Sequence, residues 1–238
     1  MITGGGSNWK QEEPLETTAA AAVQPPRPDW RSLILIGLLI PFAYQIGLSA
    51  FAYLFPLTLV PPNGWIALHV LTDILFVACP LIAVREPLKE AWRTLGGKHV
   101  PWFDGALAVI IGLLLSYGFE VLWNVVVYAL WHVTPDFGFP QSAQDVGPFV
   151  LLVVLVGPLG EEVFFRGYFR YLITRSWLFL LVSSLVWAAL HIDPVAFLPY
   201  FWTGLILGYL RQRFQSFYPP LALHVLLNVL ALVLFFWT

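Results

Sequence analysis

The chain has 238 residues, of which 59% are hydrophobic and only 11% charged, and its net charge is −2. Soluble domains carry about 25% charged residues, so this composition excludes an ordinary soluble domain. It is typical of helices that each cross a membrane with about 20 apolar residues. The sequence contains no basic run of the kind that binds nucleic acid, so a nucleic-acid partner is excluded and the lipid bilayer is the expected surrounding.

Residues 1–31 are rich in glycine, alanine and proline, and this composition predicts a flexible cytoplasmic tail. Seven apolar segments follow the tail. Backbone groups in lipid must form their hydrogen bonds within the protein, so we predict that all seven are helices. The expected fold is an all-α, polytopic transmembrane bundle of about seven spans. The predicted segments are 33–55, 65–84, 104–131, 148–173, 177–191, 195–210 and 219–237.

The basic residues are confined to alternate connections of this bundle. All 12 Lys and Arg residues lie in the tail or in the stretches 85–98, 166–175 and 211–213, whereas 56–64, 132–147 and 192–194 contain none. Cytoplasmic loops of membrane proteins are enriched in Lys and Arg. We therefore predict an integral, multi-pass membrane protein whose N-terminus is cytoplasmic.

The fourth segment contains two adjacent acids, Glu161 and Glu162, followed by Arg166. An ionisable residue inside a span costs about 2.5–3.5 kcal/mol on insertion scales, so it indicates function by default. Glu162 and Arg166 are four residues apart in the order that favours a helical ion pair. Glu161 points about 100° away from Glu162 and has to find its partner on another helix. Pro158, just before the pair, is expected to bend the helix.

Two further segments carry polar side chains that need hydrogen-bond partners inside the bundle. Trp187 and His191 share one helix face, and His224 and Asn228 share another. By chain position, His191 lies about 22 Å from the end of its helix that carries the basic residues. His224 lies nearer to the corresponding end of its own helix. A tilt, the bend at Pro158 or a shifted boundary would have to bring the groups together.

Such a cluster allows two kinds of chemistry. A desolvated carboxylate can take a proton from water and later return it to a leaving amine, while a His or Asn side chain donates to the developing oxyanion. Alternatively, Glu161, His191 and His224 could be zinc ligands with one open position, and the metal would then activate the water. The spacing leaves both open, although the sequence has no HExxH pair.

Other polar residues are more typical of structural roles. Glu120 and Asn124 are four residues apart, as are His69 and Asp73, and each spacing favours a local pair. Asp193 stands before Pro194 and is interpreted as a turn residue.

Three motifs in consecutive apolar segments resemble the family of type II CAAX prenyl endopeptidases and bacteriocin-processing proteins, also called the CPBP or Abi family. Glu161, Glu162 and Arg166 match its Glu-Glu-x-x-x-Arg motif. His191 matches its Phe-x-x-x-His motif, with Trp187 at the usual Phe. His224 and Asn228 match its His-x-x-x-Asn motif. The resemblance covers about residues 148–232.

The resemblance implies an intramembrane endopeptidase with a CPBP-like catalytic core over 146–238 and accessory transmembrane helices over 32–135. Its implied substrate is a membrane-associated peptide or protein, such as a CAAX tail, and a bacterial plasma membrane is the expected location. Both metal-dependent and metal-free mechanisms are described for the family. Asn is a poor metal ligand, so we expect a glutamate-type enzyme without cofactor and keep zinc as the alternative. The implied roles are Glu161 as general base, His191 as the residue that positions water, His224 and Asn228 as the oxyanion site, and Glu162, Arg166 and Trp187 as supporting residues.

Two functions from other classes compete with the protease. A non-catalytic membrane protein that binds peptides, such as an immunity protein, would keep the fold and tolerate the loss of Glu161. A proton or ion carrier would need polar groups along a path to both faces, whereas the polar groups here gather in the last four segments.

Overall fold

The computed structural model describes residues 29–55, 61–132, 150 and 152–237, and these residues are helical with short connections. The predicted tail lies almost entirely outside them. The N-terminal helix is continuous through α1 (Trp30–Ile34), η1 (Leu35–Leu39) and α2 (Ile40–Leu54). It is followed by α3 (Pro62–Val84), the short α4 (Leu88–Thr94) and α5 (Trp102–Trp131). The second half consists of η3 (Leu152–Val156), α7 (Gly157–Glu161), η4 (Glu162–Tyr168), α8 (Phe169–Leu172), α9 (Ser176–Leu190), α10 (Phe197–Phe214) and α11 (Tyr218–Trp237).

Among the described residues, a helix lies over each of the seven predicted segments, and the all-α fold is confirmed. Three helical stretches are long and apolar enough to cross a membrane by length and composition: Trp30–Ala52, Gly64–Val84 and Trp102–Trp131. Ser176–Leu190 and Tyr218–Leu234 are shorter apolar helices. Large apolar side chains also cover the outside of the bundle, as lipid contact requires. On α5 these include Leu107, Ile110, Leu114, Val121, Leu122 and Val125.

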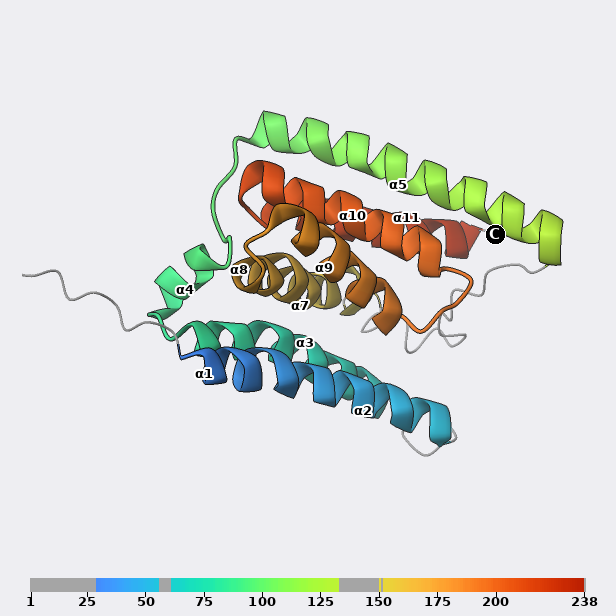
Figure 1. The fold of residues 1–238 in the computed structure, drawn as a ribbon. Coiled ribbons are helices and arrows are strands. Elements are labelled where there is room, and N and C mark those ends of the chain that lie inside the picture. Colours follow the sequence, from blue (N-terminus) through green and yellow to red (C-terminus); the bar gives the residue numbers. More distant parts are fainter. Residues whose placement is uncertain (1–28, 56–60, 133–149, 151, 238) are drawn as a thin grey trace, which may run out of the picture.

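The continuous helix from η3 to α8 lies at the centre of the bundle (Figure 1). On one side it packs against α3, which pairs with the N-terminal helix. On the other side lie α9 and α10, and α10 and α11 pack against α5. Every side chain from Glu162 to Phe169 is buried, so the motif helix is enclosed by protein over these turns.

Proline explains part of the irregularity of this helix. Pro158 does not break the helix; the turns just before it, in η3, are π-helical instead. The same arrangement occurs in the N-terminal helix, where η1 precedes Pro41. A proline ring clashes with the carbonyl one turn earlier, and the wider π turn relieves that clash. The second π segment, η4, begins at Glu162, and such turns occur frequently at functional sites.

Hydrogen bonds join the connections at one end of the bundle. Arg211 donates from Nε to the carbonyl of Arg166 at 2.9 Å and from Nη2 to that of Leu95 at 3.4 Å. Gly96 lies against this guanidinium with φ +108°, where a Cβ would be only 2.7 Å from Arg211 Nη2. Ser216 also donates to the carbonyl of Lys98. The stretches predicted to be cytoplasmic therefore meet at the same end.

Candidate active site

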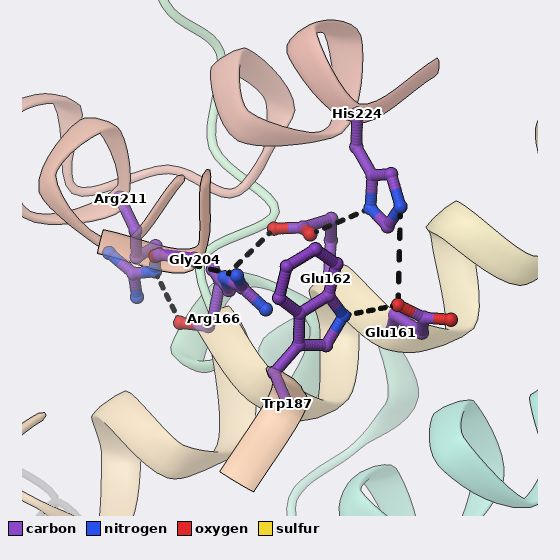
Figure 2. A network of polar contacts seen from close by, with 7 residues as sticks. All are labelled: Glu161, Glu162, Arg166, Trp187, Gly204, Arg211 and His224. Atoms are coloured by element: carbon purple, nitrogen blue, oxygen red, sulfur yellow. Dashed lines mark hydrogen bonds and ion pairs between the residues drawn. The ribbon is translucent and has the colours of Figure 1, made fainter. Parts of the chain in front are cut away.

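Trp187 organises the site from the buried face of α9. Its indole Nε1 donates a hydrogen bond to Oε2 of Glu161 (Figure 2). The guanidinium carbon of Arg166 lies 4.9 Å from the centre of its ring, a cation–π distance. The imidazoles of His191 and His224 approach the indole edge to face, with centroids 4.6 and 5.5 Å away. Trp187 is therefore in contact with all three motifs.

Glu161 finds its partners on other helices, as predicted. Its Oε2 accepts from Trp187 and lies 4.0 Å from Nε2 of His224. Both contacts use the same oxygen, and Oε1 points away from both rings (Figure 2). The Glu161 side chain keeps 24% of its surface exposed, so one carboxylate oxygen remains accessible to a reactant.

Glu162 is completely buried and has two partners. The predicted ion pair with Arg166 is present, with Arg166 Nε 3.5 Å from Glu162 Oε2. The sequence did not indicate the second contact, in which Nδ1 of His224 lies 3.0 Å from Glu162 Oε1. Since a carboxylate only accepts, Nδ1 carries the hydrogen in this contact. Glu162 thereby fixes the orientation of the His224 ring beside Glu161.

The position of His191 differs slightly from the prediction. It caps the end of α9, and its Nδ1 lies 2.8 Å from the carbonyl oxygen of Trp187. A carbonyl accepts, so Nδ1 donates in the neutral ring and Nε2 is left with its lone pair. Tyr200 of α10 stacks on the opposite side of the imidazole, with centroids 4.2 Å apart. The ring is thus held with one nitrogen available as an acceptor.

A small cavity of about 200 Å³ adjoins Glu161 and His191, and α3 forms one of its walls. Larger grooves lie elsewhere on the bundle, but their walls are mainly apolar. The polar cavity is lined by Gln45, His69, Thr72, Asp73, Phe76, Glu161, Phe165, Trp187, Leu190 and His191.

The cavity corrects the interpretation of His69 and Asp73. The spacing predicted a local pair, but the described residues show no hydrogen bond or ion pair between the two side chains. Both face the cavity that contains Glu161. The sequence did contain a signal for Asp73, because this residue is an acid inside an apolar span. Burying an acid in a membrane is costly, and the same argument singled out Glu161. The division into accessory helices and core remains a prediction, although α3 contributes to this wall.

The predictions for Asp193, for Glu120 with Asn124, and for Asn228 have different outcomes. Asp193 is confirmed as a turn residue, because its Oδ1 accepts from the backbone N–H groups of Val195 and Ala196 at 2.9 and 3.0 Å. Glu120 and Asn124 form no hydrogen bond with each other in the described part of the chain. Asn228 lies one turn beyond His224 on α11 and is half-buried, and its role at an oxyanion remains a prediction.

The zinc alternative depends on whether three donors meet at one point. No three His, Cys, Asp or Glu side chains come close enough together to hold a metal ion within the described ranges. His224 uses Nδ1 for Glu162, and His191 uses Nδ1 for a carbonyl. Each ring thus keeps Nε2 available, which is also how histidine metal ligands are commonly held, so the zinc alternative stays a prediction and we derive no step through zinc.

Known proteins resemble the same part of the chain. Residues 143–230 match the model of the family described as type II CAAX prenyl endopeptidase Rce1-like. An Escherichia coli protein named "Uncharacterized 24.3 kDa protein" is 27% identical over 177 residues, which cover 68% of this chain and 77% of that protein. The Bacillus subtilis protein named "Putative membrane peptidase YdiL" is 22% identical over 175 residues, 68% of this chain and 69% of its own length. No solved structure matches significantly.

The family match spans the helices that carry all three motifs, from the residues before η3 to the middle of α11. The apolar helices support an integral membrane protein, and the match makes its second half similar to CAAX-type membrane proteases. The resemblance predicted from the motifs is therefore confirmed over residues 143–230, which match the model of Rce1-like type II CAAX prenyl endopeptidases.

Proposed function

We propose that the chain is an intramembrane endopeptidase in which Glu161 activates water to hydrolyse a peptide bond of a membrane-associated peptide or protein. The observation that carries the proposal is the Glu161 side chain itself. One of its oxygens is held by Trp187 and the other is available beside a polar cavity in the bundle. A general base must lie within hydrogen-bond reach of the proton that it removes, and a water in this cavity meets that condition.

His191 is suited to hold the same water. Its Nε2 accepts a hydrogen bond in the tautomer that the Trp187 carbonyl selects. A water that donates one hydrogen to Glu161 and the other to His191 has its lone pairs free to attack a carbonyl carbon. Glu161 takes the proton as the carbon–oxygen bond forms, and the carbonyl electrons move onto the oxygen.

His224 and Asn228 are the proposed donors to that oxyanion. Because Nδ1 of His224 gives its hydrogen to Glu162, His224 donates from Nε2 in its doubly protonated, imidazolium form. Glu162 holds the His224 ring so that Nε2 faces Glu161, 4.0 Å from its Oε2. This separation is too long for a direct hydrogen bond, so Nε2 is available to a reacting oxygen beside Glu161. Arg166 balances the charge of Glu162, so the orienting carboxylate does not add a second uncompensated charge to the site.

The substrate is a peptide segment that reaches the site through the bilayer or from its cytoplasmic face. The connections rich in Lys and Arg meet at one end of the bundle, and we propose that this end and the N-terminus are cytoplasmic. Gln212→Cys, beside the backbone of Ser176 at that end, should react with a membrane-impermeant thiol reagent only after cells are opened. Labelling of intact cells would reverse the orientation.

The test of function is cleavage of a panel of lipidated and unlipidated peptides by the purified 238-residue chain. Glu161→Gln should lower kcat/KM by about 10²–10⁴, the usual contribution of a general base. Glu120→Gln is the matched control, because it removes another half-buried carboxyl outside the cavity. A chelator should leave cleavage unchanged. Cleavage that survives Glu161→Gln would remove Glu161 from the mechanism, and cleavage lost with chelator would require a metal.

A further inference from the structure

Asp73 is a buried carboxyl that the proposed chemistry does not yet use. Only 8% of its surface is exposed, and its side chain accepts no hydrogen bond from any described residue. An ionisable group is costly within a membrane span and indicates function by default. Its exposed fraction opens into the cavity that Glu161 lines. A structural role would require a partner, so this position indicates a role towards whatever occupies the cavity.

The packing of two helices brings Asp73 close to Glu161. At Gly160 the backbone of α7 touches that of α3, since a Cβ on Gly160 would lie 3.0 Å from Asp73 Cα and 3.1 Å from Asp73 Cβ. Glu161 is the next residue. The two side chains line the same cavity.

The charged groups around Asp73 and Glu161 affect the roles that these two carboxyl groups can take. The titratable groups that share the cavity are His69 from α3, Glu161 from α7 and His191 at the end of α9. No Lys or Arg is among the described residues that line it. Arg166 and His224 face Glu161 from outside the cavity. Two carboxyl groups that line one site can divide the roles of acid and base between them.

The hydrogen bonds distinguish the two carboxyl groups. An N–H donor stabilises an ionised carboxylate, and Glu161 has one in the indole of Trp187. Asp73 has none among the described residues and is the more deeply enclosed of the two. The contacts therefore suit Glu161 to the role of base and Asp73 to the role of acid.

We propose that Asp73 is the second catalytic carboxyl and acts as the general acid for the leaving amine, in partnership with Glu161 as the base. This inference rests on the proposed peptidase function and deepens it. It assigns a reacting group to α3, a helix that lies outside the three motifs and outside residues 143–230.

The step balances without any further reactant. Glu161 takes one proton from water while the water oxygen bonds to the carbonyl carbon. The tetrahedral intermediate then collapses, the carbon–nitrogen bond breaks, and the nitrogen leaves with the electron pair and the proton of Asp73. The products are a carboxylic acid and an amine. Afterwards the proton on Glu161 passes to the Asp73 carboxylate, which restores the starting pair.

The experiment compares two leaving groups. An amide nitrogen cannot depart without a proton, whereas an aryl ester expels a phenolate, whose conjugate acid has a pKa near 10, as for tyrosine. Matched peptides with a scissile amide or a scissile aryl ester are given to the wild-type chain, Asp73→Asn, Glu161→Gln and the control Glu120→Gln. The ratio of kcat/KM for ester and amide is measured for each. This ratio does not depend on the fraction of folded protein, and Asp73→Ser provides a second variant.

We expect Asp73→Asn to lower amide cleavage by about 10²–10⁴ and ester cleavage by less than about tenfold, so that the ratio rises by at least about tenfold. Glu161→Gln should lower both activities, because both need the attacking water. An unchanged ratio in Asp73→Asn and Asp73→Ser would overturn the role of Asp73 and leave Glu161 in place. Retention of both activities in Glu161→Gln would instead overturn the proposed function.

Discussion

Substitution of Gly160 by alanine tests whether the contact between α7 and α3 sets the geometry of the site. The added Cβ would lie 3.0 Å from the Cα of Asp73, and three atoms of Asp73 lie within 3.1 Å of it. Two of these atoms belong to the backbone, which cannot rotate away. Ordinary contact between carbon atoms is about 3.5–4.0 Å, so the two helices must separate by about 0.5–1 Å.

The expected magnitudes follow from this displacement. Overpacking of this kind costs about 1–3 kcal/mol, and alanine returns about 1 kcal/mol relative to glycine inside a helix. The net loss of stability is therefore about 0–2 kcal/mol. The effect on catalysis is larger, because a displacement of about 1 Å at a reacting group can lower the rate about 100-fold. We expect Gly160→Ala to remain folded and to lose about two orders of magnitude in kcat/KM.

Gly118→Ala is the matched control, since nothing lies within 4 Å of a Cβ added at Gly118 in α5. Both variants are compared by peptide cleavage and by the midpoint of thermal unfolding in the same detergent. Gly118→Ala should keep wild-type activity and equal or slightly higher stability. If Gly160→Ala behaved in the same way, the close approach of α3 would not matter for the site, and the reasoning that joins Asp73 to Glu161 would be refuted.

Two further predictions concern the partners of the glutamates. Trp187→Phe keeps an aromatic ring but removes the N–H that Glu161 accepts. A hydrogen bond to a charged group contributes about 1.5–3 kcal/mol, so kcat/KM should fall by about 10–100-fold with little change in the unfolding midpoint, and unchanged kinetics would show that the bond is not used. Arg166→Met leaves Glu162 buried without its cation and should lower stability by about 3–5 kcal/mol. The double variant Glu162→Gln/Arg166→Met should recover part of that loss in an unfolding titration, and a double variant no more stable than Arg166→Met would contradict a buried pair.

The sequence predicted those features of the site that depend on spacing within one helix. The pair of Glu162 and Arg166 and the shared face of Trp187 and His191 are helical neighbours, and the structure contains both. The difference in depth between His191 and His224 is bridged by the indole of Trp187, which contacts both rings. A Trp in place of the usual Phe thus does more than keep an aromatic wall, because only an indole can donate to Glu161.

The contacts that the sequence did not predict are those between different helices. A spacing of four residues favours a local pair, and this rule assigned Asp73 to His69. The backbone contact at Gly160 instead turns Asp73 towards Glu161. Likewise, the second partner of Glu162 comes from α11, 62 residues further along the chain. Spacing within one segment carries no information on such contacts.

The claim that Glu161 activates water, rather than attacking the peptide itself, is tested most directly by a single turnover in heavy-oxygen water. The purified chain in excess over a peptide is mixed with labelled water, and the new carboxyl terminus and the Glu161 side chain are analysed by mass spectrometry. The account predicts that the heavy oxygen appears in the new carboxyl terminus and that Glu161 remains unlabelled. Heavy oxygen in Glu161, with unlabelled oxygen in the product, would mean a covalent intermediate on the glutamate and would contradict the account.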